Sequence, residues 1–142
     1  MLAIDFSPKG LAKARALAAE RGVQLRTELA DVTAWRWPQN AFDVVAAIFT
    51  QFVSAAERPA FFAHLKGALK PGGLLLMQGY RPEQLIYKTG GPSDSARLYT
   101  RALLENAFGD MAQLEIREHD SAISEGTSHV GMSALIDLVA TK

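Results

Sequence analysis

The sequence predicts an α/β fold, with a mostly parallel sheet whose strands alternate with helices and which ends in an antiparallel hairpin. Short, continuous apolar runs at Phe42–Phe49 and Leu74–Gln78 are typical of strands that are covered on both faces. Segments with apolar residues at helical spacing alternate with these runs. The last third changes character, because Leu114–Ile123 and Ser133–Ala140 are strand-like segments joined by Ser124–Met132, which predicts a hairpin with a long tip.

The composition favours one domain with a small partner. The chain has 142 residues, of which 49% are hydrophobic, and its 15 basic residues balance 15 acidic ones, so it has no electrostatic reason to bind nucleic acid or an anionic membrane. It contains no cysteine, and no spacing of its histidines and carboxylates resembles a metal motif. The longest apolar runs fall well short of the roughly 20 residues of a membrane span, and no basic signal segment opens the chain. We therefore expect a single domain over residues 1–142, a cytoplasmic location and no metal.

The first 22 residues predict a strand, a turn and a helix. An apolar run, Met1–Ile4, ends in Asp5, and Ser7 suits the N-cap of a helix that Gly22 follows. An acidic residue at the carboxyl end of such a strand is where dinucleotide-type folds bind a ribose hydroxyl. Negative charge is also favourable in a turn before a helix N-terminus. The residues alone favour neither interpretation of Asp5.

Further elements follow in alternation. Val23–Asp31 predicts a second strand that again ends at a carboxylate. The next helix begins either at a capping box formed by Ser54 and Glu57 or nearer Arg58, and Lys70–Gly73 is expected to end it with a tight turn into the next strand.

A long connection separates this part from the terminal hairpin. Gly79–Tyr99 predicts a loop or short irregular helix, and a loop of this length is usually functional or mobile. Its Gly90–Pro92 turn fits either a lid or a surface turn, of which the surface turn is the safer interpretation. Thr100 can cap a last helix that Gly109 ends.

Four motifs together resemble the S-adenosylmethionine-dependent methyltransferases with a Rossmann-like fold. In chain order they read AIDFSPKGLAKAR, ELADV, FDVVAAIFTQF and LKPGGLLLMQGY. The downstream segments TGGP, LYTRALLENAF and SEGTSHVGMSALIDLVA are similar to the branch of bacterial tellurite-resistance methyltransferases. The resemblance implies an enzyme that uses S-adenosyl-L-methionine to methylate a small-molecule acceptor. Tellurite-like oxyanions, thiols and other small molecules stay open as acceptors.

The same resemblance implies cofactor-binding residues after three strands. The matched positions are Asp5, Phe6, Asp31, Val32, Ile48 and Phe49. Asp5 matches the ligand of the ribose hydroxyls, while Asp31 and Val32 match the positions that address the adenine. A solvated loop carboxylate remains an alternative for Asp31.

Aromatic and titratable residues supply the remaining candidates. Phe49, Phe52 and Tyr80 can favour a sulfonium cation, although we expect at least one of them to belong to the core. Glu125 and His129 in the predicted hairpin tip are the candidate catalytic residues, because an imidazole can accept a proton near neutral pH or orient an acceptor. A hydrogen-bonded loop histidine fits His129 equally well.

The family's first strand and its glycine-rich turn lie upstream of the position that Met1 matches. In the family that strand lies between the strand ending at Asp5 and the strand ending near Phe49. We therefore expect an N-terminally truncated domain with two unpaired sheet edges, weak or absent cofactor binding, and a homodimer that covers those edges. A non-enzymatic remnant that acts through association is the alternative function, and half of a nucleotide-binding oxidoreductase is a third.

Overall fold

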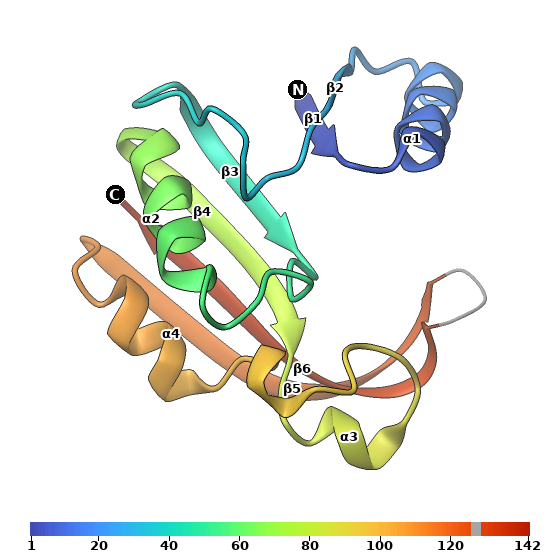
Figure 1. Ribbon diagram of the computed structural model, residues 1–142, viewed down its shortest axis with the longest axis vertical. Coiled ribbons are helices and arrows are strands. Elements are labelled where there is room, and N and C mark those ends of the chain that lie inside the picture. Colours follow the sequence, from blue (N-terminus) through green and yellow to red (C-terminus); the bar gives the residue numbers. More distant parts are fainter. Residues whose placement is uncertain (126–128) are drawn as a thin grey trace. The chain divides into compact units, whose positions relative to one another are not determined.

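The computed structural model describes residues 1–125 and 129–142, without the side chain of Glu125 (Figure 1). They form two compact units, residues 1–36 and residues 37–142. Each unit has a sheet of its own, with two strands in the first and four in the second. The expectation of a single domain stays a prediction.

The first unit is a strand, a helix and a parallel strand. Its elements are β1 (Leu2–Asp5), α1 (Pro8–Glu20) and β2 (Arg26–Leu29). Ser7 caps α1, because its hydroxyl accepts a hydrogen bond from the backbone N–H of Gly10 at 3.1 Å. The strand predicted over residues 23–31 is shorter in the structure. The backbone N–H of Val23, the first residue of the predicted strand, donates a hydrogen bond to Ala18 O at the end of α1 at 2.9 Å. This N–H therefore does not pair with a neighbouring strand.

The second unit contains a mixed sheet. Its strands are β3 (Phe42–Ile48), β4 (Leu69–Tyr80), β5 (Gln113–Glu125) and β6 (His129–Thr141), in the order β3-β4-β6-β5. β3 and β4 are parallel, whereas β6 is antiparallel to both β4 and β5. The predicted α/β class, its parallel part and its terminal antiparallel hairpin are confirmed. The hairpin tip is shorter than predicted, because the β5–β6 ladder continues to the pair Glu125 and His129.

The start of β4 differs from the prediction. The sequence predicted a tight turn at Lys70–Gly73 before a strand at Leu74, but the strand already pairs at Leu69, immediately after the helix. The pairing shifts between Phe42, which opposes Leu69, and Val44, which opposes Leu74. Between these two pairs β4 has more residues than β3, so the Lys70–Gly73 segment forms a bulge-like irregularity inside β4. Gly72, with a φ of 76°, adopts the left-handed conformation that this irregularity requires.

Two helices cover one face of the four-stranded sheet (Figure 1). They are α2 (Arg58–Ala68) and α4 (Arg101–Phe108). Their apolar stripes pack against β4 and β6 in a core that includes Phe61, Phe62, Leu65, Leu75, Leu104, Phe108, Ile136 and Leu138. The rings of Phe62 and Phe108, one from each helix, lie 4.9 Å apart between centroids. Each helix therefore closes over its own part of the sheet and touches the other.

The starts of both helices follow from local chemistry. Ser54 and Glu57 make the predicted reciprocal capping contacts at 3.3 Å, but they close a turn before α2, which begins at Arg58. Thr100 caps α4 as predicted, accepting a hydrogen bond from the backbone N–H of Leu103 at 3.2 Å. None of the helices in the described part of the chain combines the length and apolar character needed to cross a membrane.

The opposite face of the four-stranded sheet carries exposed apolar side chains. Val44 and Ile48 on β3 are each 52% exposed, and Val139 on β6 is 41% exposed. Among the described residues, β3 pairs only with β4 and β1 pairs only with β2. One edge of β3 and one edge of β1 are thus without a partner strand among the described residues, and the expected N-terminal truncation stays a prediction.

Candidate functional site

The carboxyl ends of β1 and β2 bring two predicted carboxylates to one edge. Asp5 pairs with Leu29, and Asp31 follows two residues later. Asp5 Oδ1 accepts a hydrogen bond from the backbone N–H of Ser7 at 2.7 Å, so the turn interpretation is correct for this oxygen. Asp5 Oδ2 has no hydrogen bond within the described residues. One carboxylate oxygen therefore remains available to a hydroxyl group.

Asp31 forms a similar turn at the end of β2. Its Oδ1 accepts hydrogen bonds from the backbone N–H of Thr33 at 2.9 Å and from the Thr33 hydroxyl at 2.8 Å. These two bonds, the backbone one first, hold the pKa of Asp31 below its usual 3.8. The carboxylate is exposed and charged at neutral pH, while Val32 beside it is half-buried and Phe6 is 67% exposed. This geometry fits both a solvated loop carboxylate and an acceptor for an amine.

Phe49 leaves β3 in an unusual conformation. Its backbone N–H bonds Gln78 O at 2.8 Å, and its φ of 52° lies in the left-handed region, which is rare for an aromatic residue. Its ring stacks on Tyr80 with a centroid distance of 4.7 Å. Ile48, just before it, points to the exposed face. Tyr80 is only 2% exposed, so the expectation that at least one of the three candidate aromatic residues belongs to the core is confirmed.

A cavity of about 450 Å³ opens at the carboxyl ends of β3 and β4 in the second unit. This volume is in the usual range for small-molecule sites. The walls come from four segments of the chain and include Phe49, Phe52, Tyr80, Gly91, Arg97 and His129. The structure therefore places four residues that the sequence singled out in one cavity: the three candidate aromatic residues, including Phe49 of the cofactor set, and the candidate catalytic residue His129.

His129 is the first residue of β6. Its backbone pairs with Glu125, and its half-buried ring stacks on Tyr80 with centroids 6.4 Å apart and planes 18° apart. Within the described residues its imidazole makes no hydrogen bond. Stacking on Tyr80 therefore holds the ring from one side, and the hydrogen-bonded loop histidine stays an alternative. The side chain of Glu125 lies outside the described part of the chain.

The long connection after β4 supplies another wall. It contains a short helix, α3 (Gln84–Tyr87), and a 3₁₀ turn, η1 (Ser95–Arg97). The buried side chain of Gln84 donates to Gly90 O at 3.0 Å and accepts from the backbone N–H of Ala134 at 2.9 Å, which ties the turn to β6. Gly91 has φ 84°, and a Cβ there would lie 2.8 Å from the ring of Tyr80. The Gly90–Pro92 turn therefore forms part of the cavity wall. The surface-turn interpretation did not predict this contact.

Sequence reasoning missed Gln51, which holds the cavity together. It is 2% exposed, and its amide accepts from the N–H of Tyr80 at 2.7 Å and donates to Tyr80 O at 2.8 Å and Arg97 O at 3.2 Å. Its side chain therefore joins the end of β3 to the end of β4 and to η1. In the sequence, the one indication of this role was a side-chain amide, that of Gln51, among the mostly apolar residues that follow β3.

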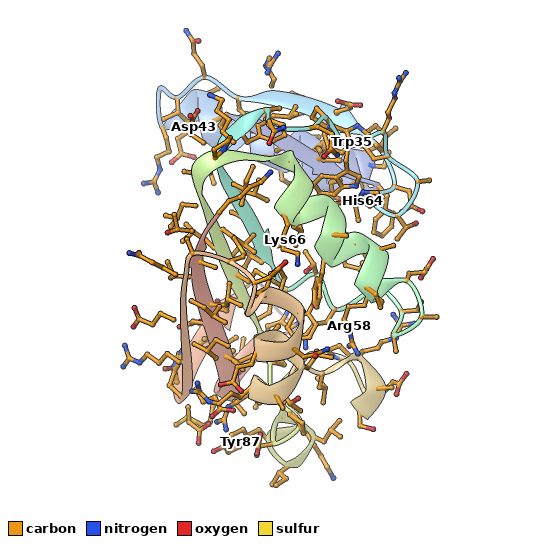
Figure 2. All side chains as sticks on the ribbon, turned by 90° about the vertical axis from the view of Figure 1, so that its left-hand side faces the viewer. Trp35, Asp43, Arg58, His64, Lys66 and Tyr87 are labelled. Carbon is orange, nitrogen blue, oxygen red and sulfur yellow. The ribbon has the colours of Figure 1, made fainter. Side chains whose placement is uncertain are left out.

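The other two histidines lie outside the cavity. His64 lies on α2 (Figure 2), and its ring stacks on that of Trp37 with centroids 5.9 Å apart. His119 on β5 hydrogen-bonds Ser121 at 2.8 Å and Asp137 at 2.9 Å across the β5–β6 ladder. The sequence identified no partner for either of them.

Residues 1–73 of the 142-residue chain match the methyltransferase domain family. A demethylmenaquinone methyltransferase of Thermus thermophilus is 37% identical over 78 residues, which cover 55% of this chain and 35% of that relative. The chain therefore spans about a third of the length of this curated relative.

Solved structures share the fold over almost the whole chain. TehB from Haemophilus influenzae has a TM-score of 0.73 at 13% identity, covering 99% of this chain and 49% of TehB. A SAM-dependent methyltransferase from Methanosarcina mazei has a TM-score of 0.69 at 14% identity, covering 99% of this chain and 81% of that protein. At these identities the likeness shows the fold alone. The family match over more than half of the chain's length shows that the chain belongs to the methyltransferase domain family, as its motifs predicted.

Proposed function

We propose that the protein uses S-adenosyl-L-methionine to methylate a small-molecule acceptor that binds in the cavity at the ends of β3 and β4. The observation that carries this proposal is the cavity itself, because a chain of this family has Phe49 and His129 on shared walls at the edge where α/β sheets bind ligands. The name of the Thermus relative, a demethylmenaquinone methyltransferase, supports a small organic acceptor.

The residues of the first unit suit a nucleoside. Asp5 and Asp31 each use Oδ1 for a local turn and keep Oδ2 without a hydrogen bond within the described residues. A carboxylate oxygen of this kind can accept from ribose hydroxyls at Asp5 and from the adenine amine at Asp31. Phe6 and Val32 follow these two carboxylates in the sequence as apolar neighbours. Ile48, at the end of β3 in the second unit, is proposed as a further apolar contact of the cofactor. The donors and acceptors present therefore fit the cofactor that the family implies.

The residues of the second unit suit an acceptor. When bound, the cofactor supplies a methyl group activated by a positively charged sulfur. The aromatic walls position the acceptor and exclude water, which are the main contributions of a protein to methyl transfer. His129 takes the proton that the acceptor loses or orients the acceptor by a hydrogen bond. Glu125, whose backbone pairs with His129, is proposed as the second titratable group at this end of the hairpin.

Binding of S-adenosylhomocysteine, the demethylated form of the cofactor, tests this proposal. The proposed function requires binding, which the truncation expectation makes weak at most, so ligand-observed NMR is the suitable measurement. Asp5→Asn keeps an oxygen for Ser7 N–H but removes the charge that strengthens hydrogen bonds to a ribose, so we expect about tenfold weaker binding. Far-UV circular dichroism checks that the variant folds.

Asp43→Asn is the matched control. Asp43 lies at the amino end of β3, at the opposite end of the second unit from Tyr87 and α3 (Figure 2), and its carboxylate binds only Lys70 within the described residues. We expect unchanged binding in this variant. Absence of binding by the wild type at millimolar ligand, or equal loss in both variants, would contradict the proposed function.

A second candidate function, self-association, is favoured by the unpaired edge of β3. Val44 and Ile48 leave apolar surface exposed beside this edge. We propose a homodimer in which two such edges cover each other.

A further inference from the structure

We propose that the cavity selects a flat, uncharged ring that carries a hydroxyl group, as in a phenol, and rejects oxyanions. This inference rests on the proposed function, in which the cavity is the acceptor site. The sequence left oxyanions, thiols and other small molecules as acceptor classes. This inference selects one member of the last class, a ring with a hydroxyl group.

The walls of the cavity favour a flat ring. The planes of Phe49 and His129 are inclined to the ring of Tyr80 by 26° and 18°, so each of the two stacks on Tyr80. Phe52, 48% exposed, adds a fourth aromatic side chain to the walls. Aromatic rings prefer offset stacking, and each such pair contributes roughly 0.5–1.5 kcal/mol beyond its area. A flat ligand ring extends the existing stack.

The charged groups of the cavity do not suit an anion. Among the described residues of its lining, Arg97 is the one guanidinium or ammonium group; its Nη1 donates to the carbonyl of Phe52 and its Nε lies 3.8 Å from Asp94 Oδ2. An oxyanion would have to compete with these acceptors and would meet the carboxylate of Asp94 on the same wall. The amide of Gln51 is already bonded to Tyr80 and Arg97.

The remaining polar groups suit a hydroxyl. In the described part of the chain, the His129 imidazole and the Ser93 hydroxyl line the cavity without a hydrogen-bond partner. An imidazole nitrogen can accept a hydrogen bond from a phenolic hydroxyl, and a site with such a group rejects a ligand that leaves it unpaired. The hydroxyl group therefore orients the ring toward His129.

Four probes test the inference. 2-Naphthol has the ring and the hydroxyl, 2-methoxynaphthalene lacks the donor, 2-naphthoate carries a negative charge, and tellurite is an oxyanion without a ring. Ligand-observed NMR titrations of the full chain are expected to show 2-naphthol binding about tenfold more tightly than 2-methoxynaphthalene or 2-naphthoate, and no binding of tellurite.

Three variants identify the site. His129→Phe keeps a ring over Tyr80 but no nitrogen, so we expect 2-naphthol to bind about as weakly as 2-methoxynaphthalene. Phe52→Ala removes an exposed wall at little risk to folding and is expected to weaken all naphthalene probes severalfold. Ile86→Ala is the control, because Ile86 is 78% exposed and does not line the cavity.

The outcomes separate this inference from the proposed function. Equal or tighter binding of tellurite or 2-naphthoate, or 2-naphthol binding that His129→Phe leaves unchanged, would overturn the inference. S-adenosylhomocysteine binding without 2-naphthol binding refutes the inference and leaves the proposed function in place. Binding of 2-naphthol without S-adenosylhomocysteine supports the ligand class of the cavity and refutes the proposed function.

Discussion

At the scale of single residues, Gln51 acts like a short piece of an additional strand. Its side-chain amide pairs with both the N–H and the C=O of Tyr80, as a neighbouring backbone would, and then reaches Arg97 O. A net hydrogen bond contributes about 0.5–1.5 kcal/mol, but a buried group left without a partner costs about 1–3 kcal/mol. Gln51 therefore stabilises the cavity chiefly because its removal would leave buried backbone groups unpaired.

Gln51→Leu should lower the free energy of unfolding by about 2–4 kcal/mol, because leucine fills a similar volume but cannot bond Tyr80 or Arg97. Urea denaturation followed by circular dichroism measures this loss. Gln113→Leu, at an exposed position of β5, is the control and should change stability by less than about 0.5 kcal/mol. Equal stability of the two variants would show that Gln51 has no structural role.

At the scale of elements, α2 and α4 are joined by polar contacts as well as by their apolar stripes. Lys66 on α2 donates to Ala107 O and to Asp110 at 2.9 Å each, at the carboxyl end of α4. The hydrogen bond from Lys66 is the largest cause that keeps the pKa of Asp110 below its usual 3.8. A cation at a helix C-terminus is favourable because the last carbonyls have no partner within the helix. The start of α4 depends instead on Thr100.

Thr100→Ala should lower the free energy of unfolding by about 1 kcal/mol, since it removes the acceptor for Leu103 N–H at the N-terminus of α4. Thr100→Ser keeps a hydroxyl at the same place and should retain most of the stability. Thermal and urea unfolding of the two variants give the comparison. A loss of the same size in Thr100→Ser would assign the effect to the lost methyl group rather than to the cap.

At the scale of the whole molecule, the two sheets leave strand edges that pair with no other described strand. β3 has one strand beside it among the described residues, and its Val44 and Ile48 are half exposed. Unpaired N–H and C=O groups along such an edge form a template for another strand. Proteins often place a charge on an exposed edge to prevent this pairing, but Val44, Ala46 and Ile48 carry none.

Light scattering after size exclusion should show a mass that rises toward twice the monomer mass as the wild-type concentration increases. Val44→Lys puts a charge beside the open edge and should shift the protein to monomer, as lysine does on natural edge strands. Ile86→Lys adds the same charge on α3, away from the edge, and should retain the dimer. A wild type that stays monomeric at all concentrations would refute the homodimer.

Local signals predicted the helices well. Ser7 and Thr100 cap α1 and α4 as expected, because a cap depends on residues within one turn of each other. Strand ends were predicted less well, since a strand continues wherever a partner offers hydrogen bonds. β4 pairs with β3 from Leu69 onward, and the β5–β6 ladder reaches Glu125 and His129. Neither extension is visible in the spacing of apolar residues.

The candidate site shows the same division. Each motif predicted its own site residue: Asp5, Asp31, Phe49 or His129. No motif predicted how far its residue lies from the others in space. Phe49 and His129 share a cavity because both rings stack on Tyr80, which lies between them in the sequence and belongs to a third segment. The roles of the predicted residues stay predictions.

By itself, the sequence determined the α/β class, the order of the elements, the capping residues and the family, because periodicity, caps and motifs are properties of neighbouring residues. Only the tertiary structure decided the pairing register of β4, the length of the terminal hairpin, the place of Gln51 and the charge of the cavity. These features depend on which distant backbone groups and side chains meet. Arg97, for example, is a cation in the sequence, but only the structure shows that its Nη1 donates to Phe52 O and that its Nε lies 3.8 Å from Asp94 Oδ2.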